Sequence, residues 1–219
     1  MGSTDPDFLR ATRASYDALA ADYADWIRDE LAAKPLDRAM LDAFAELVRA
    51  GGAGPVADIG CGPGRITAYL HGLGLPAFGI DLSPEMIASA RRAYPDLRFE
   101  VGSMPGLGLP DGGLGGIVAW YSIIHVPHER LAAVFSEFHR ALAPGGHLLL
   151  AFQVGDEVAH WSRAAGHEIS LDFHHRRPDQ VAELLAGAGL DVRARLLREP
   201  DKDGDYPEPT RQAFLLATR

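Results

Sequence analysis

Residues 56–65 read VADIGCGPGR, a short apolar run followed directly by three glycines in five positions. A continuous apolar run of this length is typical of a strand buried on both faces, as in a parallel sheet covered by helices. Glycines at such a turn let a ligand lie against bare backbone and against the N-terminus of the following helix. The stretch therefore predicts a strand, a ligand-binding turn and a helix, in that order.

The alternation of strand and helix continues along the chain. Helical spacing separates most of the apolar runs and extends throughout the first fifty residues. This order indicates an α/β protein with a doubly wound, mostly parallel sheet. We expect a helical N-terminal cap over residues 1–52 and a binding core over residues 53–219. Further strands are predicted at residues 77–80, 98–101, 117–121, 147–152, 190–197 and 213–218.

Composition and charge narrow the class of protein. The chain has 219 residues and a formal charge of −9, which argues against a nucleic-acid partner because such binding depends on clustered lysine and arginine. No apolar run approaches the length of a membrane span, and the order of a signal peptide is absent. We therefore expect a cytoplasmic protein without a membrane partner. The single cysteine, Cys61, excludes an intrachain disulfide, and the sequence leaves a homodimer open.

The turn and the next strand together predict a nucleoside-containing ligand. Asp81 ends the second strand, about 20 residues after the turn, where a carboxylate accepts hydrogen bonds from ribose hydroxyls. The spacing of Gly60, Gly62 and Gly64 is one residue shorter than the dinucleotide fingerprint. Asp58 also suits a ligand that carries an ammonium group better than a pyrophosphate. A nicotinamide oxidoreductase is therefore the weaker alternative.

On these residues the chain resembles the class I S-adenosylmethionine (SAM) methyltransferases. Asp58–Gly64 is similar to their first motif, Phe78–Ser83 to their second, and Ala141–His147 to the turn before their fifth strand. All three at matching intervals make the resemblance specific, and it covers most of the chain from about Tyr16 onward. It implies a Rossmann-like methyltransferase fold with a seven-stranded sheet, whose last strand, Ala213–Thr218, runs antiparallel.

The resemblance also implies a cofactor site, with SAM as methyl donor and S-adenosylhomocysteine as product. Asp81 is expected to hold the ribose, Leu82 to pack on the adenine, and Ser103 to replace an acidic residue that binds the adenine amino group. Tyr16 and Tyr23 resemble a pair that caps the methionine end of the cofactor, although they also suit an amphipathic helix. The expected cofactor residues are Tyr16, Tyr23, Asp58, Gly60, Cys61, Gly62, Gly64, Asp81, Leu82, Ser103, Met104, Trp120 and Tyr121.

Methyl transfer needs an aligned nucleophile and, for a hydroxyl, a group that takes its proton. We predict His125 as this general base, because imidazole titrates near neutral pH; the alternative is a histidine that only hydrogen-bonds its loop. In the resembling family the segment after the fourth strand borders the sulfonium and the acceptor. We expect residues 153–177 to form a lid. The expected substrate-binding residues are Trp120, His125, Trp161, Phe173 and His174.

The functional prediction is methyl transfer from SAM to a small molecule, at oxygen in preference to nitrogen or carbon. The alternative is a SAM-binding protein of the same fold that does not methylate, acting as a cyclase or a binding module. His160, His167 and His174 have regular spacing. The residues between them do not indicate one continuous helical face, however, and a metal site needs fixed, converging ligands. We therefore predict no metal.

Overall fold

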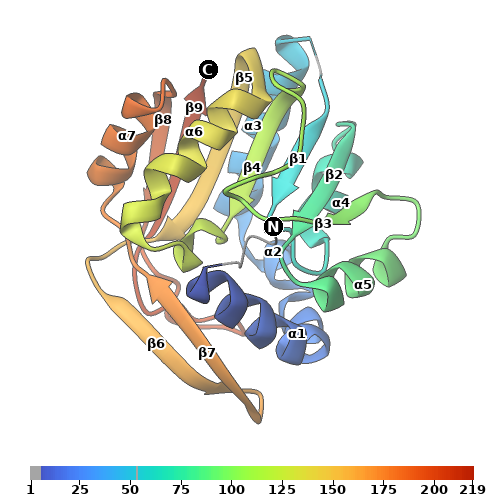
Figure 1. The fold of residues 1–219 in the computed structure, drawn as a ribbon, viewed down its shortest axis with the longest axis vertical. Coiled ribbons are helices and arrows are strands. Elements are labelled where there is room, and N and C mark those ends of the chain that lie inside the picture. The colour runs from blue at the N-terminus through green and yellow to red at the C-terminus, as the bar shows by residue number, and fades with distance from the viewer. Residues whose placement is uncertain (1–5, 53) are drawn as a thin grey trace.

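A seven-stranded sheet forms the centre of the molecule (Figure 1). The computed structural model describes residues 6–52 and 54–219. The last strand of the chain runs antiparallel to both of its neighbours, whereas the other pairs of strands are parallel, which confirms the predicted fold. In spatial order the strands are β3 (Phe99–Val101), β2 (Ala77–Asp81), β1 (Val56–Ile59), β4 (Leu114–Trp120), β5 (Leu142–Gln153), β9 (Gln212–Thr218) and β8 (Asp191–Arg198).

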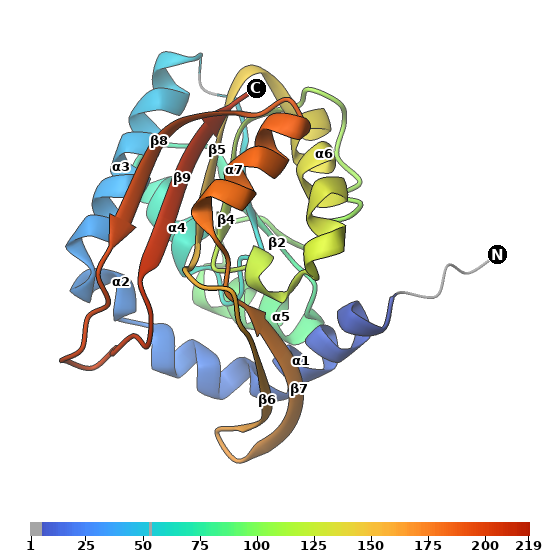
Figure 2. The ribbon, with the colours of Figure 1, turned by 90° about the vertical axis from the view of Figure 1, so that its left-hand side faces the viewer.

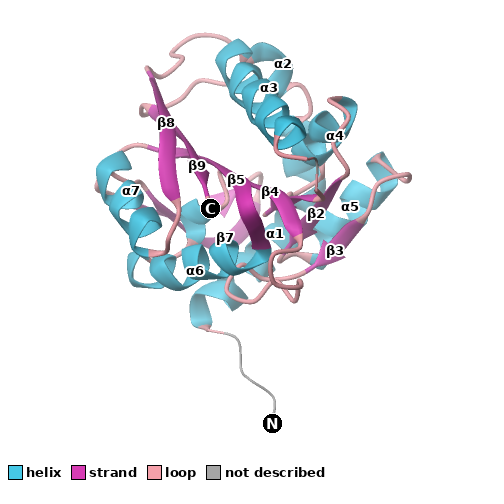
Figure 3. Ribbon diagram, turned by 90° about the horizontal axis from the view of Figure 1, so that it is seen from above, coloured by secondary structure: helices cyan, strands magenta, loops and turns pink. Residues whose placement is uncertain are grey.

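Helices cover both faces of this sheet (Figure 3). Each face therefore carries its own apolar core, which explains why the strands are almost continuously apolar. Among the described residues, none of the helices combines the length and apolar character needed to cross a membrane. The covering helices are α3 (Pro35–Ala50) and α4 (Arg65–Gly72) on one face, and α6 (Leu131–Ala141) and α7 (Pro178–Gly187) on the other.

The start of β5 differs from the prediction. The strand begins at Leu142, which pairs with Leu114 of β4, and the register then shifts before His147 pairs with Gly116. Residues 143–146, predicted as a turn before the strand, therefore lie within its irregular first part. The cause is backbone pairing with β4 on both sides of the irregularity.

The first helix and a two-stranded hairpin lie together at the carboxyl end of the parallel strands (Figure 2). Helix α1 (Asp7–Ile27) packs against β7 (His167–His174), which pairs antiparallel with β6 (Val158–Ala164). The segment expected to be a lid thus contains a β-hairpin. The short helix α2 (Glu30–Ala33) follows α1, so the N-terminal region is helical as predicted. Residues 1–5 of the predicted cap and residue 53 at its border lie outside the described residues.

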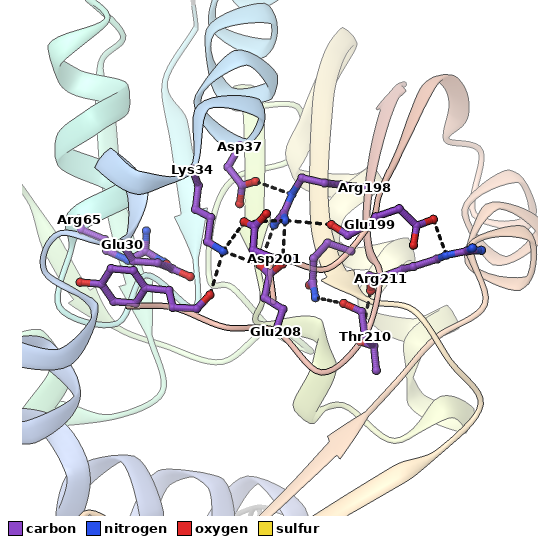
Figure 4. Close-up of polar contacts among 12 residues, drawn as sticks. Glu30, Lys34, Asp37, Arg65, Arg198, Glu199, Asp201, Glu208, Thr210 and Arg211 are labelled. Atoms are coloured by element: carbon purple, nitrogen blue, oxygen red, sulfur yellow. Dashed lines mark hydrogen bonds and ion pairs between the residues drawn. The ribbon is translucent and has the colours of Figure 1, made fainter. Parts of the chain in front are cut away.

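A largely buried ionic network ties the start of α3 to the segment between β8 and β9 (Figure 4). Lys34 Nζ lies 2.6 Å from Asp201 Oδ2 and 3.2 Å from Glu208 Oε1. The two terminal nitrogens of Arg198 donate to the carboxylate of Glu208, each at 2.7 Å, and its Nε lies 3.1 Å from Asp37 Oδ1. Removing one partner would leave a buried charge uncompensated. The network therefore holds the N-terminal helices against this edge of the sheet.

Candidate active site

A cavity opens where the carboxyl ends of β1, β2 and β4 meet α1. It holds about 810 Å³ of empty space, its open mouth included. Doubly wound sheets bind their ligands at this end of the strands. Of the predicted site residues, those that line the cavity are Tyr16, Tyr23, Gly60, Gly62, Asp81, Leu82, Ser103, Met104, Trp120, Tyr121 and His125.

The glycines of the turn after β1 serve different purposes. Gly60 and Gly62 both have a left-handed backbone, with φ of 77° and 53°, which side chains rarely adopt. A Cβ at Gly60 would lie 2.3 Å from Ser122 Cβ, so protein packing excludes a side chain there. A Cβ at Gly62 would find the Tyr23 ring, at 3.9 Å, as its nearest neighbour. Gly62 is thus the glycine that keeps the cavity open.

Asp81 is fixed at the end of β2 by backbone donors. Its carboxylate accepts the N–H groups of Gly62 and Ser83, both at 2.8 Å, and burial raises its pKa to about 6. The Ser83 hydroxyl in turn accepts the Met86 N–H and caps α5 (Pro84–Ala93). A carboxylate has about four lone-pair sites. Asp81 therefore has capacity left for hydroxyls of a ligand in the cavity.

Ser103 presents an unpaired hydroxyl on the same side of the cavity. Its Oγ is buried and has no hydrogen-bond partner among the described residues. Native proteins seldom leave a buried polar atom unpaired. Ser103 lines the cavity together with Leu82 and Met104, so its unpaired hydroxyl is a candidate partner for a ligand there.

His125 is held between α1 and the hairpin, at the end of a short 3₁₀ turn, η1 (Ile123–His125). Its Nδ1 lies 2.9 Å from the Asp172 carbonyl oxygen, which can only accept, so Nδ1 carries the proton. Its Nε2 is then the acceptor for the Tyr16 hydroxyl at 2.7 Å. The Phe173 ring packs edge-on against the imidazole, with 4.8 Å between ring centroids. These contacts fix one tautomer and one orientation of the ring.

Burial corrects the predicted acid–base behaviour of His125. Its pKa is lowered to about 4, not near neutrality, because the imidazolium ion would lose its hydration inside the protein. The pKa of the Tyr16 phenol is raised well above its usual value for the same reason. Both side chains are therefore neutral at physiological pH. The Nε2 of His125 is unprotonated and accepts the Tyr16 hydroxyl, but the imidazole is a weaker base than the sequence predicted.

Three predicted cofactor residues of the first motif do not line the cavity. Asp58 is fully buried and accepts the Thr67 hydroxyl at 2.7 Å; burial raises its pKa to about 7, and its Oδ1 has no hydrogen-bond partner among the described residues. Cys61 packs against Phe99. A Cβ at Gly64 would lie 2.7 Å from the same ring. These residues lie against other parts of the protein, Thr67 and Phe99, and their contact with a cofactor stays a prediction.

The hairpin residues predicted to bind substrate lie outside the cavity. Phe173 packs between His125 and Trp161, and its ring centroid is 4.8 Å from each. The Trp161 residue is 52% exposed. His174 points the other way from Phe173, as neighbours on a strand do, and lines a second cavity. Of the predicted substrate residues, Trp120 and His125 alone line the first cavity.

Sequence reasoning missed the cavity face of α1. Its residues recur at three- and four-residue intervals with Tyr16, and this helical spacing could have identified them. The neighbouring stripe of the helix, with Ser15 and Leu19, packs on the hairpin. The missed cavity residues of α1 are Phe8, Leu9, Thr12 and Arg13; those elsewhere are Ile59, Ile80, Ser83, Met86, Gly102, Pro105, Ser122 and Val126.

Two of the three regularly spaced histidines bind carboxylates. His160 Nδ1 lies 2.7 Å from Asp172 Oδ1, and His167 Nε2 lies 2.9 Å from Asp22 Oδ2. Within residues 6–52 and 54–219, no three histidine, cysteine or acidic side chains are placed so that they could hold a metal ion.

Comparison with known proteins extends these observations. Residues 56–146 match the model of a methyltransferase domain. The chain is 37% identical to trans-aconitate 2-methyltransferase of Escherichia coli O157:H7 over 135 residues, which are 60% of this chain and 50% of that protein. It is 35% identical to demethylmenaquinone methyltransferase of Chlorobaculum parvum over 92 residues, 42% of this chain and 37% of that protein. The chain thus spans half the length, or less, of these curated relatives.

Solved structures share the whole fold at lower identity. Magnesium protoporphyrin IX methyltransferase from Synechocystis PCC 6803, solved with bound SAM, has a TM-score of 0.72 and 16% identity, with 100% of both chains covered. A 1,6-didemethyltoxoflavin N1-methyltransferase from Burkholderia thailandensis, solved with S-adenosylhomocysteine, has a TM-score of 0.71 and 19% identity, with 100% of this chain and 92% of that chain covered. By its motifs and its domain match, the chain is similar to the class I SAM-dependent methyltransferases, and it has their fold.

Proposed function

We propose that this protein binds SAM in the cavity and transfers its methyl group to an oxygen atom of a small molecule. The observation that carries the proposal is the pairing of two unlike walls around one space. One wall offers the open backbone at Gly62 and the anchored carboxylate of Asp81. The other offers the hydrogen-bonded pair of Tyr16 and His125.

The first wall fits SAM residue by residue. The lone pairs that Asp81 has left suit the two ribose hydroxyls, and the unpaired Ser103 hydroxyl suits the adenine amino group. A side chain at Gly62 would fill the space beside the glycine turn. Aromatic faces that line the cavity, at Tyr23 and Trp120, favour a positively charged ligand. When bound, SAM supplies a methyl group attached to a positively charged sulfur.

The second wall suits an acceptor with a hydroxyl group. An acceptor hydroxyl that donates to the Tyr16 oxygen lies one hydrogen bond from His125 Nε2, and Tyr16 can pass its own proton on to that nitrogen. With a pKa of about 4, His125 is too weak to ionise a free hydroxyl. It can take the proton late, once the forming carbon–oxygen bond has made that proton strongly acidic. Tyr16 and His125 also align the acceptor hydroxyl, and this alignment supplies the rest of the rate enhancement.

The hairpin and α1 form the acceptor side of the site in this proposal. Asp172 orients His125 through its carbonyl group, and Phe173 covers the imidazole ring. The names of the relatives describe methyl transfer to small molecules, including trans-aconitate and demethylmenaquinone. We propose the same class of acceptor, a small molecule, for this chain, and we assign it none of those particular substrates.

Incubation of the protein with SAM that carries a ¹³C-labelled methyl group tests the proposal. The acceptor panel contains small alcohols, phenols, carboxylic acids, amines and activated carbon acids. The chemical shift of the transferred methyl distinguishes bonds to oxygen, nitrogen and carbon, and we expect oxygen. Transfer to nitrogen or carbon would overturn the acceptor atom. Tight SAM binding without consumption across the panel would favour a binding module or a cyclase.

A further inference from the structure

A second cavity lies at the base of the hairpin, and basic side chains gather on its wall. It is formed by the end of β7, the start of α7 and a second 3₁₀ turn, η2 (His128–Arg130), and it shares no lining residue with the first cavity. Asp156 is the one acidic residue among those that line it, and the carboxylates of Asp172 and Glu129 act on His174 from outside the lining. Such a wall stands out in a chain whose formal charge is −9. The basic residues are His128, His174, His175, Arg176 and Arg177.

Arg176 is a buried cation without an acidic partner. It is 4% exposed, and no carboxylate of the described residues forms an ion pair with it. Its Nη2 donates to the carbonyl oxygens of Ile123, at 2.8 Å, and Val126, while its Nε has no hydrogen-bond partner. Burial lowers its pKa to about 10, so the guanidinium is still charged at neutral pH. Buried charges are normally paired, and here the partner is missing.

The wall around Arg176 is held rigidly by the backbone. The Arg176 N–H donates to the Gln153 carbonyl at 2.9 Å, and its carbonyl accepts the Gly155 N–H at 3.2 Å. The His175 N–H donates to the Glu157 carbonyl at 2.9 Å. The His175 Nδ1 is itself buried without a hydrogen-bond partner among the described residues. The two residues that carry these unpaired nitrogens, Arg176 and His175, both line the cavity.

We propose that this cavity binds a small oxyanion, a phosphate or a carboxylate group of a small molecule, through Arg176, Arg177 and His175. Arg177 Nε lies 3.8 Å from Asp156 Oδ1, a long ion pair in which an incoming oxyanion can replace the carboxylate. The positive end of α7, which begins at Pro178, adds to the attraction. Binding here does not depend on methyl transfer, because neither the ligand nor the wall belongs to the first cavity.

Titration with inorganic phosphate and, separately, with acetate tests the site. Binding is measured at neutral pH by calorimetry and by the ring resonances of the histidines. We expect saturable binding that shifts the signals of His174 and His175. Arg177→Gln and His175→Gln should each weaken it about tenfold, the usual effect of losing a hydrogen bond to a charged group. Arg176 is left unchanged because it also holds η1.

Two further variants sharpen the result. Asp156→Asn removes the competing carboxylate and should tighten anion binding, the opposite of the effect expected for Arg177→Gln and His175→Gln. Arg98→Gln, an exposed arginine of the far sheet edge that pairs with Glu100, makes the same change of charge as Arg177→Gln and should leave binding unchanged. Preference for phosphate identifies a phosphoryl ligand, and equal binding of acetate identifies a carboxylate; both uphold the site. No saturable binding of either anion, or binding indifferent to Arg177 and His175, overturns it.

Discussion

The two walls of the active-site cavity are built in different ways. On the sheet wall, the key contacts join neighbours in the motif region: Asp81 binds Ser83 two positions away and Gly62 across the adjacent strand. The wall of α1 and the hairpin is assembled by hydrogen bonds between residues 47 to 155 positions apart in sequence. Tyr16 meets His125 in this way, and Ser15 meets Ser170.

This difference separates residues that the fold requires from residues that can be replaced without changing the fold. The sheet wall depends on backbone conformations that few residues can adopt, so its chemistry is tied to the fold. The other wall depends on side chains carried by one helix and one hairpin, which can change without disturbing the sheet. We infer that the sheet wall sets the cofactor, whereas the α1–hairpin wall sets the acceptor.

Replacement of the two glycines tests the sheet wall with the largest expected effect. Gly60→Val should destabilise the protein by about 3 kcal/mol or more, because its side chain would collide with Ser122 and force a left-handed backbone. Gly62→Val has the backbone cost without the collision, so it should keep more stability but lose SAM binding. Denaturant unfolding and calorimetry separate the two outcomes. Equal stability of the variants would contradict the packing role of Gly60.

Replacement of His125 tests the opposite wall. His125→Ala should lower turnover by roughly 10² or more for a hydroxyl acceptor, with SAM affinity nearly unchanged. Tyr16→Phe removes the link to the acceptor and should lower turnover as well. Because burial lowers the pKa of His125 to about 4, the wild-type rate at saturating SAM should fall only as the pH approaches 4, not near 6.5. Near-normal turnover of His125→Ala would make this histidine a structural residue.

The same contrast explains how much the sequence could predict. The positions of most strands, the glycine turn, the place of Asp81 at the end of β2 and the Ser83 cap could be predicted because each depends on short-range spacing and backbone geometry. His125 was identified as a candidate base, but its tautomer and its low pKa depend on the hairpin that buries it. No local pattern places Asp172 or Phe173 against a ring far along the chain.

The glycine turn shows the same limit on a smaller scale. All three glycines suggested a ligand lying against bare backbone, but Gly60 and Gly64 make room for Ser122 and Phe99. Only Gly62 leaves space in the cavity. Sequence spacing indicates that a side chain is excluded, whereas the identity of the excluding atom depends on tertiary packing.

Asp81 offers a test with a pH dependence. Asp81→Asn should weaken SAM binding by about 1 to 3 kcal/mol, because hydrogen bonds to a charged group are lost. In the wild type, burial raises the pKa of this carboxyl to about 6, so lowering the pH through 6 protonates it and should weaken binding. The variant should lack this component of the pH profile. Calorimetry at several pH values makes the comparison, and identical profiles would exclude Asp81 from the site.

Ser15 tests the α1–hairpin wall with the smallest expected effect. Its hydroxyl donates to the Ala11 carbonyl at 2.8 Å and accepts the Ser170 N–H of the hairpin at 2.9 Å. Ser15→Ala removes that acceptor and leaves the Ser170 N–H to water or unpaired, which should cost about 1 kcal/mol. We expect faster hydrogen exchange in the hairpin and a higher KM for the acceptor, with SAM affinity unchanged.

Ser136 provides the matched control for this variant. Its hydroxyl makes the same kind of bond within its own helix, to the Ala132 carbonyl at 2.9 Å, on an exposed face of α6 away from the hairpin. Ser136→Ala should therefore change neither hairpin exchange nor KM. If Ser15→Ala instead weakened SAM binding and left the acceptor KM unchanged, the assignment of the cofactor to the sheet wall and of the acceptor to the α1–hairpin wall would be wrong. Docking of the hairpin would then have to be assigned to the cofactor side of the site.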